Sequence, residues 1–268
     1  MALRLNTTKQ AYKAFPEKGT APNTEQMPKL IADGRVPMNV SQLMQRRLDV
    51  RNAEAGVKTD WMDNYFDTGD AIIYHPDGRV KIVLDSQHLR EITPQSKLNG
   101  GALVLTENDY NAFQGQEFKK GKLGKTGTSL SKANVKAQPI WKVLARDQNL
   151  LDDYADYIFA EGKQRFNYDD AMGIYTTFTN GKTPEMRAWY VDRLGGRSMA
   201  DGWGILVSDI GRLVGLAPEA LGALGKGVGT IKTYAMADVQ EAKSQLDALS
   251  EVVKSENLDK VRTLVGKL

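Results

Sequence analysis

The stretch AIIYHPDGRVKIVLD, residues 71–85, decides the expected fold. Two runs rich in Ile, Val and Tyr flank the sequence Pro76-Asp77-Gly78. Because proline fixes its own φ and glycine accepts a positive φ, this order predicts a β-hairpin. A third apolar run, residues 102–105, follows two glycines and is expected to join the hairpin in a small antiparallel sheet.

Helical patterns lie on both sides of this region in the sequence. In PMNVSQLMQRRLDVRNAEAG, residues 37–56, the apolar residues follow helical spacing, and Asn39 or Ser41 can cap the start. Thr106 can cap a short helix over 107–113. A helical pattern also starts at Pro139, and another helix is predicted from Thr183-Pro184 to the glycines at 195–196. Two further amphipathic patterns follow within 237–266.

These patterns predict an α+β protein, with a small antiparallel sheet near residues 71–85 and a mainly helical C-terminal half. Residues 1–36 show no helical or strand period and are expected to form an extended or mobile arm. Residues 37–136 would contain the hairpin and a basic loop. Residues 137–268 would be mainly helical, and this region can be continuous with the preceding one.

Composition removes several kinds of chemistry. The chain of 268 residues has no cysteine and two histidines, so disulfides, thiolate nucleophiles and sites with three imidazole ligands from one chain are excluded. No secretory apolar segment and no run of apolar residues long enough to span a membrane is found. We therefore expect a protein that is cytoplasmic or particle-associated and has no membrane partner, and we expect no cofactor.

Charge is distributed unevenly along the chain. Residues 1–150 carry 22 basic and 16 acidic side chains, whereas residues 151–268 carry 14 basic and 17 acidic ones. Segment 118–146 contains seven lysines and one arginine but no Asp or Glu. Such blocks attract polyanions, because a polyanion is recognised mainly through Lys and Arg contacts. The expected binding residues are Lys119, Lys120, Lys122, Lys125, Lys132 and Lys136.

The basic segment includes Gly124-Lys125-Thr126, which is also part of a Walker A pattern. That pattern needs a glycine at position 119, where this chain has lysine. An exposed basic loop is therefore favoured over a nucleotide cradle. Docking of this loop on an acidic surface of a neighbouring subunit, such as residues 60–70, is an alternative to nucleic acid, and a merely solvated loop is another.

Thr68-Gly69-Asp70 followed by Asp77-Gly78-Arg79 resembles, at the same spacing, the TGD…DG hairpin of adenylate-forming enzymes. The resemblance implies that Asp70 would hold ribose hydroxyls. The chain departs from that family after Arg79, where VKIVLDSQHLREI replaces the expected hinge sequence, and the upstream phosphate loop is absent from residues 1–67. The turn preferences of Pro, Asp and Gly in a β-hairpin also explain these residues without any nucleotide.

The polar residues in and near the hairpin include four candidate metal ligands, His75, Asp77, Asp85 and His88. Asp77 is favoured there simply as a turn former, and His88 lies beyond the second strand. We therefore expect these residues to be polar surface groups and predict no metal site.

Together these features favour a non-catalytic structural or assembly protein of the shell or nucleoprotein-particle type. We expect it to form homo-oligomers and to associate with DNA, RNA or another polyanion through the Lys-rich loop. No catalytic residues are assigned. The alternative is an enzyme that binds a nucleotide or another phosphorylated small molecule, and a partner-binding module built on 237–266 is a third interpretation.

Overall fold

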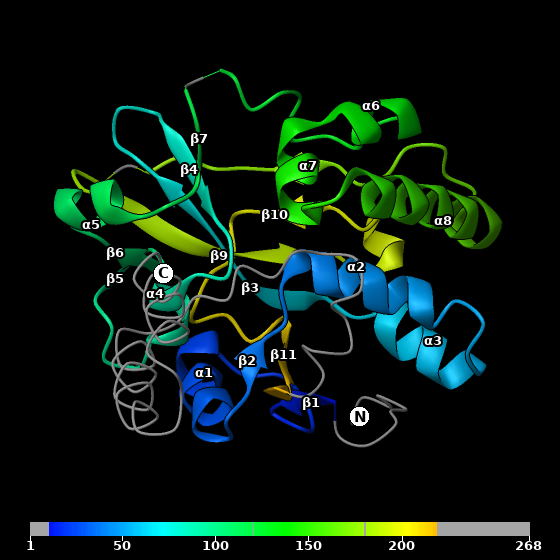
Figure 1. Ribbon diagram of the computed structural model, residues 1–268, viewed down its shortest axis with the longest axis horizontal. Helices are drawn as coiled ribbons and strands as arrows, with labels where there is room; N and C mark the ends of the chain where they lie inside the picture. Colours follow the sequence, from blue (N-terminus) through cyan, green and yellow to red (C-terminus); the bar gives the residue numbers. More distant parts are fainter. Residues whose placement is uncertain (1–10, 120, 180, 219–268) are drawn as a thin grey trace, which may run out of the picture. The chain divides into compact units, whose positions relative to one another are not determined.

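The central hairpin of the computed structural model forms at the predicted turn (Figure 1). Strands β3 (Phe66–Tyr74) and β4 (Val80–Val83) run antiparallel, and Ile73 lies opposite Lys81. Gly78 closes the turn with a φ of 88°, a conformation that glycine adopts without steric cost. The structure describes residues 11–119, 121–179 and 181–218. The predicted hairpin is confirmed.

The hairpin is part of a large mixed sheet of eleven strands in the described residues. Strand β3 pairs antiparallel with β9 (Glu185–Val191) and parallel with β11 (Arg212–Leu216). The main path runs β1-β11-β3-β9-β10-β8. The other strands are β1 Tyr12–Phe15, β2 Val36–Pro37, β5 Leu98–Asn99, β6 Ala102–Val104, β7 Gln116–Phe118, β8 Ile174–Tyr175 and β10 Ala200–Asp201.

The α+β class is confirmed, and β6 joins the sheet as expected, through β9. The expectation of a small antiparallel sheet is wrong, because β11 and β1 extend the sheet on one side of β3, and β9, β10 and β8 extend it on the other.

Strand β9 occupies the segment for which the sequence predicts a helix from Thr183-Pro184. Its residues alternate between two buried environments, with Met186 and Ala188 in one core and Trp189 and Val191 in another. Because both faces are buried, the apolar residues 188–191 follow one another without a two-residue period. The prediction of a helix over this segment is therefore wrong.

Helices cover both faces of the sheet. Ile72 and Trp189 face the core formed with α2, α3, α6, α7 and α8, whereas Ile73 and Met186 face the core formed with α1, α4 and α5. The helices are α1 Asn23–Ala32, α2 Val40–Asp49, α3 Ala55–Met62, α4 Gln87–Arg90, α5 Glu107–Ala112, α6 Lys132–Ala137, α7 Pro139–Ala145, α8 Gln148–Phe166 and the 3-10 turn η1 Leu194–Gly196.

Local capping explains where several helices begin. Asn39 accepts a hydrogen bond from the backbone N–H of Gln42 while the Gln42 side chain accepts from the Asn39 backbone, which is a capping box. Thr106 caps α5 in the same way. The helical pattern after Pro139 is divided into α7 and α8 at Arg146, which has a φ of 65°. These local predictions are confirmed, apart from this break.

The first segment of the chain differs from its prediction. Residues 11–36 contain β1 and α1 instead of an extended arm, because β1 pairs with β11 and α1 buries Met27 and Leu30 in the second core. The first core contains Trp61 and Trp141, so it includes residues on both sides of position 137. The predicted helices within 237–266 lie outside the described residues. No helix in the described part of the chain is long and apolar enough to cross a membrane.

Candidate functional site

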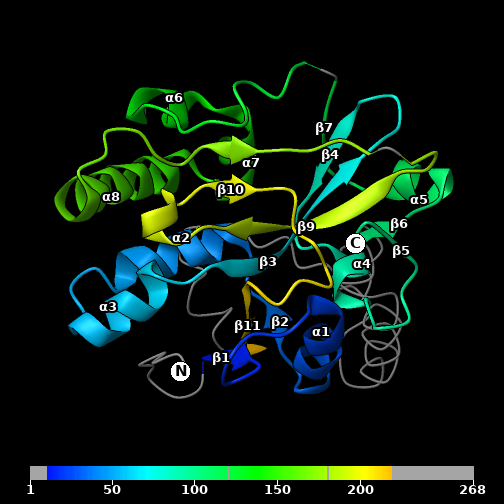
Figure 2. The same ribbon diagram turned by 180° about the vertical axis from the view of Figure 1, so that it is seen from behind.

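A row of four side chains crosses one face of the sheet. Register places Asp67 of β3 opposite Tyr190 of β9, and Tyr190 opposite Asp201 of β10. Asp201 in turn lies opposite Tyr175 of β8. Figure 2 shows β3, β9 and β10 side by side. Directly opposed residues share a face and stand about 5 Å apart, so carboxylates and phenol rings alternate across four strands.

Hydrogen bonds and ring contacts hold this row together. The Tyr190 hydroxyl donates to Asp201 Oδ2 at 2.8 Å, and the backbone N–H of Trp203 donates to Asp201 Oδ1 at 2.6 Å. The ring centroids of Tyr65 and Tyr190 lie 6.4 Å apart, and those of Tyr175 and Trp203 lie 6.0 Å apart. We name this surface the carboxylate–aromatic face, formed by Tyr65, Asp67, Tyr175, Tyr190, Asp192, Asp201 and Trp203.

The carboxylates of this face are held in an environment that disfavours their charge. Burial raises the pKa of Asp67 to about 6. Burial and the nearby charge of Asp201 raise the pKa of Asp192 to about 7, although Arg47 and Arg193 act in the opposite direction. Burial also raises the pKa of Asp201. None of these three carboxylates forms an ion pair with another described residue, so the face can accept a cation.

A loop after β10 borders the carboxylate–aromatic face and exposes apolar side chains. The exposed fractions are 46% for Trp203, 50% for Val207 and 65% for Ile210. Gly204 lies against the backbone of Ala188 in β9, so the loop rests directly on the sheet. The close approach of the loop to β9 requires glycine here, because a Cβ at position 204 would meet the carbonyl oxygen of Ala188. The face thus combines open apolar area with half-buried carboxylates.

The structure places the predicted lysines in two different settings. Lys119, Lys122 and Lys125 are exposed on the loop between β7 and α6. The side-chain amide of Gln138 donates to the carbonyl oxygens of Leu123 and Lys125 at 3.0 and 3.2 Å, which gives this loop a defined shape. The loop therefore presents three lysines to solvent.

The remaining predicted lysines differ from these three. Lys132 and Lys136 lie on α6 and form ion pairs with Asp156 of α8 at 3.0 and 3.2 Å. Lys120 lies outside the described residues. Asp156 is therefore a local acidic partner that the acid-free segment 118–146 did not reveal, because the contact requires α6 to pack on α8.

The two segments that resemble nucleotide-binding motifs have other local roles. Helix α6 begins at Lys132, so no helix opens at Thr126 as a phosphate loop requires. The Asp70 carboxylate is buried and accepts hydrogen bonds from the backbone N–H groups of Val40 and Asp85, both at 2.9 Å. It also accepts from Arg146 Nη2 at 2.8 Å. These bonds join the start of α2 to the end of the hairpin.

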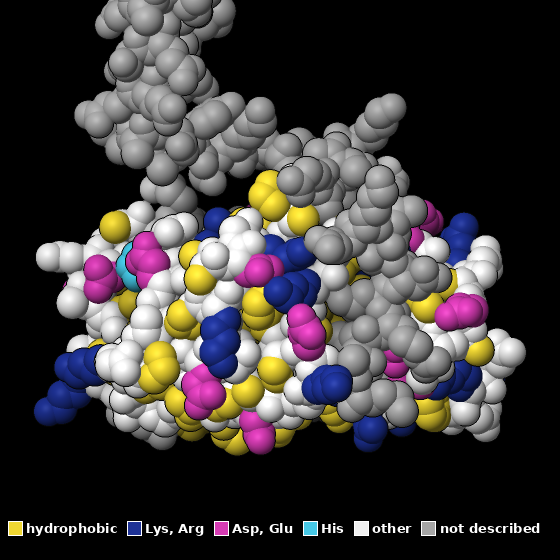
Figure 3. All heavy atoms as spheres, turned by 90° about the horizontal axis from the view of Figure 1, so that it is seen from below, with side chains coloured by type: hydrophobic (Ala, Val, Ile, Leu, Met, Phe, Trp, Pro, Cys, Tyr) yellow, Lys and Arg dark blue, Asp and Glu magenta, His cyan; other side chains and the backbone are white. Residues whose placement is uncertain are grey.

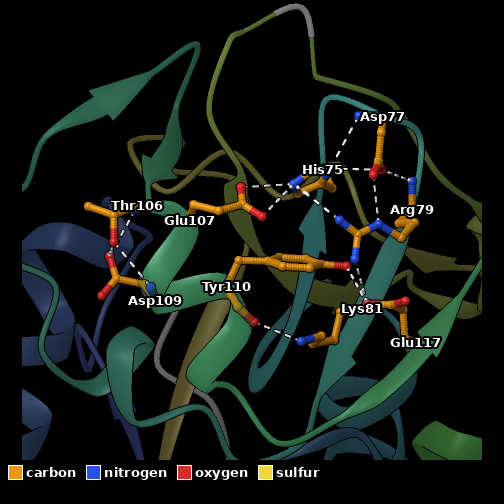
Figure 4. Close-up of polar contacts among 9 residues, drawn as sticks. All are labelled: His75, Asp77, Arg79, Lys81, Thr106, Glu107, Asp109, Tyr110 and Glu117. Carbon is orange, nitrogen blue, oxygen red and sulfur yellow. Dashed lines mark hydrogen bonds and ion pairs between the residues drawn. The ribbon is translucent and has the colours of Figure 1, made fainter.

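The polar residues at the hairpin turn form a separate network (Figure 4). His75 Nε2 lies 3.0 Å from Glu107 of α5, and His75 Nδ1 lies 2.7 Å from Asp77. Arg79 bridges Asp77 and Glu117, at 2.7 and 3.3 Å. The Arg79 and His75 bonds to Asp77 outweigh burial and lower its pKa to about 2. The network fastens the turn to α5 and to strand β7.

The four residues from which a metal site can be drawn are not brought together as one donor set. Asp85 is bound instead by Arg146 at 2.5 Å and by the Asn39 amide at 2.9 Å. In the described ranges, no group of three or more His, Asp or Glu side chains is arranged to hold a metal ion.

The sequence prediction missed the carboxylate–aromatic face because its members come from distant segments. They are neighbours only through strand register, and the sequence predicts a helix where β9, which carries Tyr190, is found. The alternation in Tyr190-Val191-Asp192 was an available signal, since it places two polar side chains on one face of a strand.

Comparisons with known proteins identify a fold likeness. No family model matches the chain, and no curated protein matches it. The chain is similar to a solved structure described as "Accommodation of massive sequence variation in Nanoarchaeota by the C-type lectin fold". The identity is 12%, the TM-score is 0.56, and the match covers 80% of this chain and 99% of that chain. The likeness indicates a C-type lectin-like fold.

Proposed function

We propose that this protein is a non-catalytic binding and assembly protein that recognises its ligand through the carboxylate–aromatic face. The observation that carries the proposal is the row of alternating acids and rings from Asp67 to Tyr175. Aromatic rings supply apolar contact area, and convergent carboxylates fix the orientation of a bound group. Clustered groups with raised pKa values support the same surface.

The fold likeness supports this use of the sheet. In the similar solved structure, the C-type lectin fold is described as accommodating massive sequence variation. Backbone hydrogen bonds hold a sheet together, so partly exposed side chains on one of its faces can serve recognition. We propose that the carboxylate–aromatic face serves recognition in this chain.

A binding screen tests the proposal. We expect that a ligand selected from an immobilised library of glycans and peptides binds the wild-type chain and loses about tenfold or more of its affinity with Trp203→Ala or Tyr190→Ser, because stacking and hydroxyl contacts are removed. Phe166→Ala on α8 is the matched control, since Phe166 is also 46% exposed. Equal loss with the control, or no loss with the face variants, would contradict the proposal.

A second candidate function is association with a polyanion, or with an acidic surface of a second copy, through the Lys-rich loop. The specific observation is that Lys119, Lys122 and Lys125 are exposed on a loop shaped by Gln138. Three exposed lysines on one loop suit successive phosphates.

Salt dependence tests this second function. Changing all three loop lysines to Gln is expected to lower the slope of log K against log salt for duplex DNA by about 2–3. Lys132→Gln with Lys136→Gln should change the slope less, because Asp156 already pairs with both. Wild-type binding to DNA and RNA that is independent of salt would rule out this function, and light scattering reports whether the loop variant dissociates an oligomer.

A further inference from the structure

The carboxylates of the carboxylate–aromatic face differ from three other buried or half-buried acids of the described fold. Asp70 and Asp85 share the guanidinium of Arg146, and Asp63 pairs with Arg165. Asp192 and Asp201 have no such partner in the described segments, although both are half-buried. A buried carboxylate is stabilised in its charged form by a cation. The face is therefore complementary to a positive group.

The Asp67 carboxylate has an uncharged neighbour instead of a cation. The Asn23 side chain hydrogen-bonds to Asp67 and lowers its pKa against the effect of burial. Asn23 is 3% exposed, and its Oδ1 has no hydrogen-bond partner within the described part of the chain. An unsatisfied acceptor at such burial is costly. Because this oxygen is buried, a ligand on the face does not reach it, and Asn23 acts through its hydrogen bond to Asp67.

Aromatic rings lie on both sides of Asp201. Tyr65 and Tyr190 form one ring pair, and Tyr175 and Trp203 form the other. Arg193 already lies over the Tyr65 ring at 5.5 Å, so a guanidinium fits against these rings. A Lys or Arg side chain gains a cation–π contact and a carboxylate contact in the same place.

The exposed apolar side chains of the loop after β10, which we call the apolar border, indicate that the ligand of this face is more than a bare cation. Trp203, Val207 and Ile210 are about half exposed or more, and Asp209 lies between the last two in sequence. On the surface shown in Figure 3, hydrophobic side chains lie scattered among charges of both signs. A segment that carries apolar side chains next to its cations would cover this border and meet the carboxylates at once.

We infer that the ligand of the carboxylate–aromatic face is a basic segment of a partner protein, with Lys or Arg side chains alternating with apolar ones. This inference rests on the proposed function. The positive side chain lies between the Tyr190 and Tyr175 rings against Asp192 and Asp201, while apolar side chains of the same segment cover Trp203, Val207 and Ile210. A row across four strands about 5 Å apart is about 15 Å long, which is the length of about four to five residues of an extended segment.

Fluorescence anisotropy with defined peptides tests the inference on the full chain. The probes are labelled ten-residue peptides that alternate Lys with Leu, Lys with Ser, and Glu with Leu. We expect the Lys/Leu peptide to bind about tenfold or more tightly than the Lys/Ser peptide, because only the former covers the apolar border, and we expect no binding of the Glu/Leu peptide.

Substitutions locate the binding. Asp192→Asn with Asp201→Asn is expected to weaken Lys/Leu binding about tenfold or more, and Val207→Ser with Ile210→Ser should reduce the difference between the Lys/Leu and Lys/Ser peptides. Asp152→Asn with Asp153→Asn on α8 removes the same charge elsewhere and should leave binding unchanged. Circular dichroism and Tm check that each variant is folded.

The outcomes separate the two proposals. Equal binding of the Lys/Leu and Lys/Ser peptides, or unchanged binding after the Asp192 and Asp201 substitutions, overturns the inference. If the library screen yields a glycan or an acidic ligand that depends on Trp203, the inference fails and the proposed function stands. If no ligand depends on the face, both fail. Competition by a second copy of the chain would identify the basic segment as its own and supports the inference.

Discussion

Replacing Arg47 with methionine is expected to lower the free energy of unfolding by about 3–5 kcal/mol. Arg47 is fully buried, and its guanidinium donates to the carbonyl oxygens of Trp61, Asn64 and Asp192 and to the hydroxyl of Tyr154. Methionine fills similar apolar space but leaves these acceptors without a donor. The cost follows from their burial, because water cannot replace the lost bonds.

Thermal and urea unfolding check this result. A loss of about 3 kcal/mol corresponds to a Tm lower by about 6–12 °C in a chain of this size. Arg51→Met is the control, since Arg51 is exposed just after the same helix. A change no larger than that of the control would mean that the guanidinium bonds add little to stability.

Replacing Asp67 with asparagine is expected to stabilise the fold at pH 8 and to have little effect at pH 4. Burial raises the pKa of Asp67 from 3.8 to about 6. Between these values the folded state binds more protons than the unfolded state, so stability falls as pH rises from about 4 to about 6. Above this interval the charged carboxylate costs up to about 3 kcal/mol, and asparagine removes that cost.

The pH dependence distinguishes titration from packing. Urea unfolding of the wild type and of Asp67→Asn at pH 4, 6 and 8 should give curves that separate only as pH rises. Asp209→Asn, a change at an exposed carboxylate in the neighbouring loop, is the control. A gain of the same size at every pH would show that the amide packs better beside Asn23, and it would remove the charge explanation.

Local sequence signals predicted local structure well. The turn at 76–78 produced the hairpin, and Asn39 and Thr106 cap their helices, because each depends on residues close in sequence. Strand β9 could not be recognised in this way, since both of its faces are buried and its partners β3 and β6 lie far away in the chain. Without β9 the connection between β3 and β10 is missing, and so the size of the sheet could not be predicted either.

The candidate sites also differ in whether local sequence or tertiary structure determines them. The loop lysines could be identified because composition alone marks an acid-free segment. The pairing of Lys132 and Lys136 with Asp156 could not, because it depends on helix packing. The carboxylate–aromatic face depends still more on tertiary structure, since Asp67 and Tyr190 are neighbours only through register.

The pairing of β1 with β11 determines how the fold responds to mechanical tension. These are the first and last described strands, and they run antiparallel with Tyr12 opposite Leu216. A pull on these two residues acts at one end of the ladder, where the hydrogen bonds lie perpendicular to the strands and parallel to the force. The hydrogen bonds between β1 and β11 then break one after another, starting at the pulled end. A tether through these two positions would therefore load the pairing of β1 with β11 directly.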